Sequence, residues 1–214
     1  MSSRTPTVAS TQAAADPADD VPITPVGVDV GTKQLVAVAT ADAHLSDAVV
    51  VDGERARRVF GAFQAATHRL QERAHSAESL GDVVWRYWRR VRREFRTAAE
   101  AVLTVVDKHP RPVVVLEDLP HDRPDPLVAC RCGNARASTW FPTVTQAVVA
   151  DHVVDAGVPV AYVNPKHTTQ QCHRSDLLAC VEDSTIVCTT EDCPVGEVDR
   201  DRSAAVSIVK RTLD

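Results

Sequence analysis

Hydrophobic residues after position 25 occur in short runs that are separated by polar or glycine-containing stretches. The first three runs, at residues 26–30, 34–40 and 48–51, are rich in valine and alanine, and apolar runs of this length predict β-strands. Short polar connections at residues 31–33 and 41–47 join them. Because consecutive strands at such spacing form hairpins, we expect an antiparallel meander of three strands.

A helical period replaces the strand pattern between residues 54 and 108. This segment contains no proline and two glycines, and its apolar residues recur every three or four positions, as at Trp88, Val91 and Phe95. Such spacing places them on one side of an amphipathic helix. We expect one or two long helices here, with a break near Gly81.

The second half of the chain alternates apolar runs with helical segments. Residues 158–163 form a continuous apolar run, and residues 113–119 form an apolar run that ends in acids. Such runs are typical of strands buried on both faces. Residues 140–156 predict a helix between them, and residues 201–212 predict a closing helix. Hairpin strands that lead into parallel strands with crossover helices form the layout of the RNase H-like fold, an α/β fold whose mixed sheet is flanked by helices.

The sequence therefore divides into three parts. Residues 1–25 are rich in Ser, Thr, Ala, Asp and Pro and predict a disordered leader. Residues 26–165 and 199–214 predict the RNase H-like domain. Residues 166–198 contain four of the six cysteines and predict an irregular insertion. A chain of 214 residues is long enough for one domain with such an insertion.

Composition narrows the class of protein further. With 44% hydrophobic and 25% charged residues the chain matches globular averages, which excludes a wholly disordered chain, a coiled coil or a collagen-like chain. No apolar run approaches the roughly 18 residues that a membrane-spanning helix needs, and the polar start lacks a secretion core. The sequence thus predicts a cytoplasmic protein with no membrane partner, whose cysteines are metal ligands or buried thiols rather than disulfides.

The formal net charge of −5 counts against a nucleic-acid binder, whose affinity comes from neutralising phosphates. Residues 85–96, however, contain six arginines and four aromatic residues. The arginines that we expect to cluster away from the apolar stripe of this helix are Arg86, Arg89, Arg90 and Arg93. There they would contact the phosphates of DNA or RNA. The alternative interpretation is a solvated basic face without a ligand.

Three acidic residues stand at the ends of predicted core elements. Asp29 lies in the first strand, Glu117 in the strand after the long helix, and Asp201 at the start of the last helix. In an RNase H-like sheet these strands are neighbours and the last helix crosses them, so we expect the carboxylates to meet. Such oxygen ligands suit Mg²⁺ or Mn²⁺, and two ions about 4 Å apart can hydrolyse a phosphodiester. Taken singly, the acids also fit a turn, a strand end and a helix N-terminus.

Four segments resemble, in order, the signatures of one nuclease family. They read GVDVGTK at 27–33, VLEDL at 115–119, NP at 164–165 with TTQQC at 168–172, and DRDRSAA at 199–205. Over nearly all of its ordered length the chain is similar to the OrfB (TnpB) proteins of insertion sequences, which are relatives of the type V CRISPR effector nucleases. The resemblance implies a RuvC-type nuclease domain, interrupted by a zinc ribbon, that cuts DNA under the direction of a guide RNA.

The resemblance also implies roles for single residues. Asp29, Glu117 and Asp201 match the three catalytic positions, because the last family signature is Asp-x-Asn-Ala-Ala and selects Asp201 over Asp199. Ser203 stands in place of the Asn of that signature. Family members carry a substantial domain before the first nuclease strand, so the resemblance implies a short form that lacks this domain.

The zinc ribbon of the family uses two Cys-x-x-Cys pairs, and this sequence departs from both. Ser175 stands where the second ligand of the first pair belongs, after Cys172. The second pair is stretched and consists of Cys188 and Cys193. Three thiolates without a fourth ligand bind Zn²⁺ poorly.

His173 and Cys180 are the candidates for the fourth Zn²⁺ ligand. With either of them the ribbon would hold zinc, and the alternative is a ribbon that ordinary packing holds without metal. Cys130 and Cys132 are separated by one residue, match no zinc pair and are interpreted as plain thiols.

Two other functions are consistent with parts of the sequence. Residues 27–32 also resemble the first phosphate loop of sugar kinases and actin-like ATPases, but the chain contains no Gly-Gly pair for their adenosine segment. The more serious alternative is a shortened relative that binds DNA or RNA without cutting and acts as a regulator or an inactive remnant. Retention of all three acids favours the nuclease.

Overall fold

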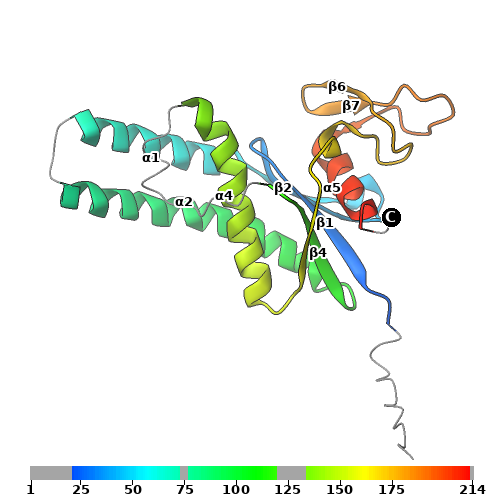
Figure 1. The fold of residues 1–214 in the computed structure, drawn as a ribbon, viewed down its shortest axis with the longest axis horizontal. Helices are drawn as coiled ribbons and strands as arrows, with labels where there is room; N and C mark the ends of the chain where they lie inside the picture. Colours follow the sequence, from blue (N-terminus) through cyan, green and yellow to red (C-terminus); the bar gives the residue numbers. More distant parts are fainter. Residues whose placement is uncertain (1–20, 73–76, 120–133, 213–214) are drawn as a thin grey trace, which may run out of the picture.

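The fold is taken from a computed structural model that describes residues 21–72, 77–119 and 134–212 (Figure 1). Most of the expected leader, residues 1–20, lies outside these ranges, as do Cys130 and Cys132.

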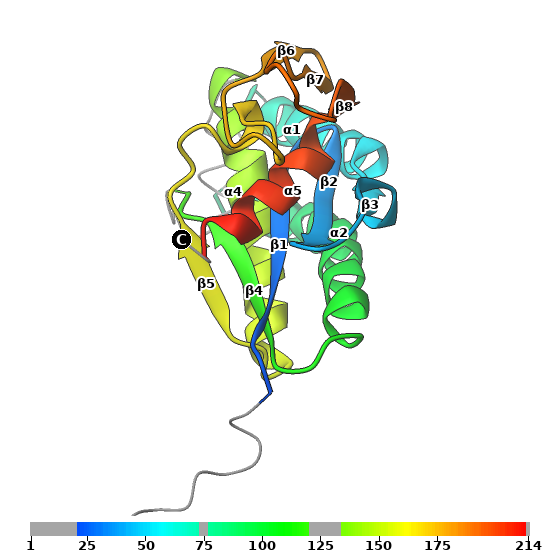
Figure 2. The same cartoon turned by 90° about the vertical axis from the view of Figure 1, so that its right-hand side faces the viewer.

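Five strands form the central sheet, in the spatial order β3-β2-β1-β4-β5 (Figure 2). In chain order they are β1 (Thr24–Val30), β2 (Gln34–Thr40), β3 (Val49–Asp52), β4 (Pro112–Glu117) and β5 (Val160–Val163). β2 pairs antiparallel with β1 and β3, whereas β4 pairs parallel with β1 and β5. Both the meander and the mixed sheet that the sequence predicts are confirmed.

Helices cover both faces of this sheet (Figures 1 and 2). On one face lie α1 (Glu54–Glu72), α2 (Ala77–Val106) and α4 (Asn134–Asp155), and on the other lies α5 (Arg200–Lys210). The main core forms where α2 and α4 meet the sheet, for example through Phe95, Phe141 and Val28. None of the described helices is long and apolar enough to cross a membrane.

Two helix boundaries differ from the predicted ones. α1 ends at Glu72 and α2 begins at Ala77, whereas Gly81, where the sequence predicts a break, lies inside α2. A glycine costs a helix only about 1 kcal/mol relative to alanine, and burial of Val84 and Trp88, at roughly 1.5–3 kcal/mol for a side chain of this kind, outweighs that cost. α4 begins at Asn134 instead of residue 140, because the first residues of the helix are mostly polar and give no apolar period.

The insertion is more ordered than the sequence predicts. It contains a 3-10 turn, η3 (Thr168–Gln170), and a three-stranded antiparallel sheet of β6 (Cys180–Glu182), β7 (Thr185–Val187) and β8 (Glu197–Asp199). These strands have only three residues each, too few for an alternating pattern to be recognised. β8 leads directly into α5, so the ribbon is joined to the helix that crosses the main sheet.

Close packing of α5 on β1 depends on Gly27. A Cβ atom there would lie 2.1 Å from the Ala205 carbonyl oxygen and 2.6 Å from Val209 Cγ2. We therefore expect Gly27→Ala to lower the free energy of unfolding by about 3 kcal/mol. Gly61→Ala on α1, where nothing lies within 4 Å, should instead raise it by about 0.5–1 kcal/mol. Urea unfolding measures both values, and equal effects of the two substitutions would contradict this packing.

Candidate metal-dependent active site

Strand register brings Asp29 and Glu117 to one level of the sheet. β1 and β4 are parallel neighbours in which Gly27 pairs with Val115, and the two acids each follow two residues later. Side chains alternate between the faces of a sheet. A two-residue step therefore keeps both acids on the face toward which a Cβ atom at Gly27 would point. That face is covered by α5.

The helix α5 brings the third acid to this face. Ala205 lies over Gly27, and Asp201 precedes Ala205 by about one helical turn. Its position is marked by Gly31, where a Cβ atom would lie 3.9 Å from Asp201 Oδ2. Asp29 lies between Gly27 and Gly31 in the chain. Since α5 runs past both glycines, the geometry places Asp201 beside Asp29.

The charges of Asp201 and Glu117 both act on Asp29. Asp29 is 3% exposed, and its pKa is raised well above the ordinary value, first by burial and then by the charges of Asp201 and Glu117. Burial raises the pKa of Asp201, although Arg200, 3.0 Å away, acts in the opposite direction. Burial also raises the pKa of Glu117. A bound cation would remove the penalty of ionising all three.

The three carboxylates are spread more widely than the cysteine sulfurs of the ribbon. In the described residues, one group of three or more ligand-type side chains has all its ligand atoms within 4.8 Å of one another, and this group consists of cysteines. The oxygens of Asp29, Glu117 and Asp201 are thus spread more widely than that.

Asp199, the other acid of this signature, has a structural role. It is the N-cap of α5, where Oδ1 accepts a hydrogen bond of 2.9 Å from the Arg202 backbone N–H and Oδ2 accepts one of 3.2 Å from Gln34 Nε2. A capping carboxylate satisfies the free N–H groups of the first turn. Asp201, 5% exposed and inside that turn, is left as the acid that faces Asp29.

Thr168 and Gln146 hold Glu117 in place. The buried Thr168 hydroxyl donates a hydrogen bond to Glu117 Oε1, and Gln146 Nε2 donates one of 2.6 Å to the Glu117 carbonyl oxygen. This hydrogen bond from Thr168, together with the charge of Arg211, lowers the pKa of Glu117 against the effect of burial. Thr168 belongs to the third signature segment, but no pattern in the sequence marks its contact with Glu117.

Thr168→Val should shift the pH dependence of any cleavage that needs ionised Glu117. Without the hydroxyl, the pKa of Glu117 rises further, so the acid limb of the rate profile moves to higher pH. Loss of such an outer partner of a ligand typically costs about 10–100-fold in metal affinity or activity. Thr168→Ser keeps the donor and should restore the wild-type profile. Superimposable profiles for Thr168→Val and wild type would show that the hydrogen bond has no role in the reaction.

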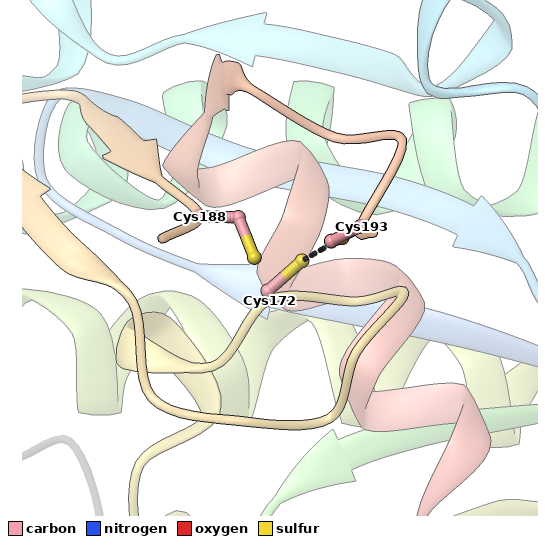
Figure 3. A group of neighbouring side chains, drawn as sticks. All are labelled: Cys172, Cys188 and Cys193. Carbon is pink, nitrogen blue, oxygen red and sulfur yellow. Dashed lines mark hydrogen bonds between the residues drawn. The ribbon is translucent and has the colours of Figure 1, made fainter. Parts of the chain in front are cut away.

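The ribbon places three cysteine sulfurs together. Cys172 follows η3, Cys188 follows β7 and Cys193 precedes β8, and their sulfurs converge (Figure 3). The sulfurs of Cys172 and Cys193 are 3.8 Å apart. Hydrogen bonds from the Thr190 side chain, from Ser175 and from the Thr190 backbone lower the pKa of the Cys188 thiol to about 6, which favours the thiolate form that binds metal. Thiolates are ligands that zinc prefers, and a closed structural zinc site needs a fourth ligand besides these three.

The fourth position of this group is occupied by Ser175, whose hydroxyl lies 3.6 Å from Cys188 Sγ. Neither expected fourth ligand belongs to the group. Cys180 is exposed on β6, and His173 Nδ1 lies 3.1 Å from Ser203 Oγ on α5. His173 thus connects the ribbon to α5 through Ser203, which follows Asp201 by two residues.

A basic surface covers the exposed side of α2. Its six arginines are Arg86, Arg89, Arg90, Arg92, Arg93 and Arg96, and they line a concave surface with Thr97 and Glu100. None of the six has a carboxylate within 4.0 Å in the described parts of the chain. The nearby Glu94 instead pairs with Arg55 of α1 at 3.0 Å. Sequence reasoning missed Arg92 and Arg96.

Comparison with solved structures shows the fold. A chain of the Cas12f1-sgRNA-target DNA complex matches with a TM-score of 0.63 and 17% identity, covering 90% of this chain and 52% of that chain. A chain of the CRISPR-Cas12f ternary complex matches with a TM-score of 0.52 and 16% identity, covering 95% of this chain and 40% of that chain. No protein-family model and no curated protein matches the sequence.

A third match is to T. thermophilus RuvC in complex with a Holliday junction substrate, with a TM-score of 0.38 and 14% identity. It covers 88% of this chain and 90% of that chain, and at this TM-score we draw no conclusion from it. The two Cas12f matches confirm the RNase H-like fold. The chain spans about half the length of those chains or less.

Proposed function

We propose that this protein is a metal-dependent DNA endonuclease of the transposon-associated TnpB type, with Asp29, Glu117 and Asp201 as its catalytic residues. The observation that carries the proposal is the convergence of three acids, from two neighbouring strands and a crossing helix, with raised pKa values. A structural role for one acid would not explain why all three share one face.

The donor set fits Mg²⁺ or Mn²⁺, because it offers carboxylate oxygens and no soft ligand. Asp29, Glu117 and Asp201 would hold the metal, which supplies an activated water and stabilises the leaving oxygen of the phosphodiester. Within the chain, Thr168 orients Glu117. The ion pair with Arg200 lowers the pKa of Asp201 against the larger effect of burial.

DNA and a guide RNA are the proposed partners. Two solved structures with this fold are described as complexes with target DNA and an sgRNA, or as a ternary complex. Among the described residues the arginines of α2 have no carboxylate partner, so their charge is free to attract such a ligand, and the proposed phosphate contacts are Arg86, Arg89, Arg90 and Arg93. The ribbon would bind one Zn²⁺ through Cys172, Cys188 and Cys193.

A cleavage assay that compares variants of Asp201 and of the nearby acid Asp199 tests the proposal. The protein is purified with its bound RNA and incubated with single- and double-stranded DNA in Mg²⁺ or Mn²⁺. We expect wild type to cleave and Asp201→Asn and Glu117→Gln to be inactive. Asp199→Asn is the matched control, because Asn caps a helix as well as Asp, and it should retain activity. Cleavage by Asp201→Asn would remove the assigned mechanism, and binding without cleavage by wild type would support the non-cleaving alternative.

A further inference from the structure

Trp85 is a large apolar side chain that the fold leaves in solvent. The residues around it on α2, Val84 and Trp88, are buried in the core, whereas Trp85 is 52% exposed. A tryptophan side chain buries a large apolar area when it is covered, so its exposure forgoes substantial stabilisation. Tryptophan is enriched at interfaces, because its indole is apolar but carries a polar N–H group.

The exposed indole belongs to the arginine surface of the same helix. Residues four, seven and eleven positions after Trp85 share its side of an α-helix, and in this chain they are Arg89, Arg92 and Arg96. All three are exposed and line the concave surface described above. Like charges at a spacing of four residues repel, as Arg92 and Arg96 do here, and a bound polyanion would offset that repulsion.

We propose that Trp85 is a base-stacking platform and that the α2 surface binds single-stranded nucleic acid, with Arg89, Arg92 and Arg96 on the backbone phosphates. The inference deepens the proposed function, on which it rests, by naming the form of the bound strand. A duplex offers phosphates to the arginines but keeps its base faces stacked inside. An unpaired strand offers both phosphates and free base faces, which stack on aromatic side chains in a sequence-tolerant way.

Binding of fluorescein-labelled oligo(dT) and of a labelled duplex, followed by anisotropy, tests this assignment. The buffer contains no added Mg²⁺ and no chelator, so that cleavage does not interfere and bound zinc is retained. Trp85→Ala should weaken oligo(dT) binding about tenfold, the loss expected for one stacked base, and leave duplex binding unchanged. Trp85→Phe should restore most of the affinity. Val154→Ala, which truncates another exposed apolar side chain, on α4, is the control and should change neither.

Equal losses for oligo(dT) and duplex in Trp85→Ala, or no loss for either, would overturn the stacking assignment. Arg92→Gln should weaken both ligands, because it removes a phosphate contact that single and double strands share. The two proposals fail separately. If wild type binds oligo(dT) through Trp85 but does not cleave DNA, only the proposed nuclease activity is contradicted. If wild type cleaves DNA and Trp85→Ala binds oligo(dT) normally, only the stacking role of Trp85 is contradicted.

Discussion

The Asp29→Asn variant is expected to lose at least about a thousandfold in metal-dependent cleavage, since the metal stabilises the transition state by several kcal/mol. In the absence of divalent cations the same variant should be more stable than wild type. Asp29 is buried between two other acids, and burial and their charges both raise its pKa. A neutral amide of the same shape removes a buried charge that is unfavourable without metal.

The pH dependence of this stability difference follows from the direction of the pKa shift. An acid whose pKa is higher in the folded state than the ordinary value of 3.8 destabilises the fold increasingly as the pH rises above the ordinary pKa, and the penalty is complete once the pH exceeds the raised one. As the pH falls through the raised pKa toward the ordinary one, the penalty disappears. The advantage of Asp29→Asn over wild type should therefore be largest near neutral pH and vanish in acid.

Thermal unfolding with and without Mg²⁺ checks the prediction. Near neutral pH and without Mg²⁺ we expect the Tm of Asp29→Asn to exceed that of wild type by at least about 2 °C. In a protein of this size a shift of about 2 °C corresponds to about 0.5–1 kcal/mol. Mg²⁺ should raise the Tm of wild type and leave that of the variant unchanged. A variant that is less stable than wild type and still responds to Mg²⁺ would show that Asp29 is not at a cation site.

The second large effect is expected in the ribbon. Ser175→Cys adds a fourth thiolate at the position that the serine hydroxyl occupies beside Cys188, and four thiolates form a closed structural zinc site. Loss of a residue that only hydrogen-bonds to a metal ligand costs about 10–100-fold in metal affinity. Gain of a direct ligand should therefore raise the zinc affinity by at least about tenfold. Cys172→Ser, which removes one of the three converging thiols, should abolish zinc binding.

Competition with a chromophoric chelator measures these affinities, and metal analysis gives the stoichiometry. Wild type should hold about one zinc per chain, and Cys180→Ser should match it, because Cys180 lies outside the sulfur group. Zinc binding that survives Cys172→Ser, or that is lost in Cys180→Ser, would contradict the assignment. Since His173 links the ribbon to Ser203 on α5, chelation of zinc is also expected to lower cleavage.

The central sheet and the meeting of the acids were predictable from the sequence because both depend on strand order. Apolar runs of four to seven residues identify strands. Once the strand of Asp29 and the strand of Glu117 are neighbours, their register alone brings the two acids to one level. The position of Asp201 follows from its place in the first turn of the helix that packs on Gly27.

Contacts between segments far apart in the chain were not predictable in the same way. The hydrogen bond from Thr168 to Glu117 joins residues 51 positions apart, and no periodicity marks it. The fourth position of the sulfur group depends on how the loop after Cys172 turns, which places Ser175 there and directs His173 to Ser203. Spacing alone left His173 and Cys180 as candidates.

The central claim is that Asp29, Glu117 and Asp201 bind divalent metal together. Anomalous diffraction from crystals of the protein soaked in Mn²⁺, recorded on both sides of the manganese absorption edge, tests it most directly. We predict manganese peaks between β1, β4 and the start of α5, within about 2.0–2.3 Å of oxygens of all three carboxylates, a distance range typical of hard-cation ligation. Manganese bound elsewhere, with no peak at these three side chains, would contradict the account.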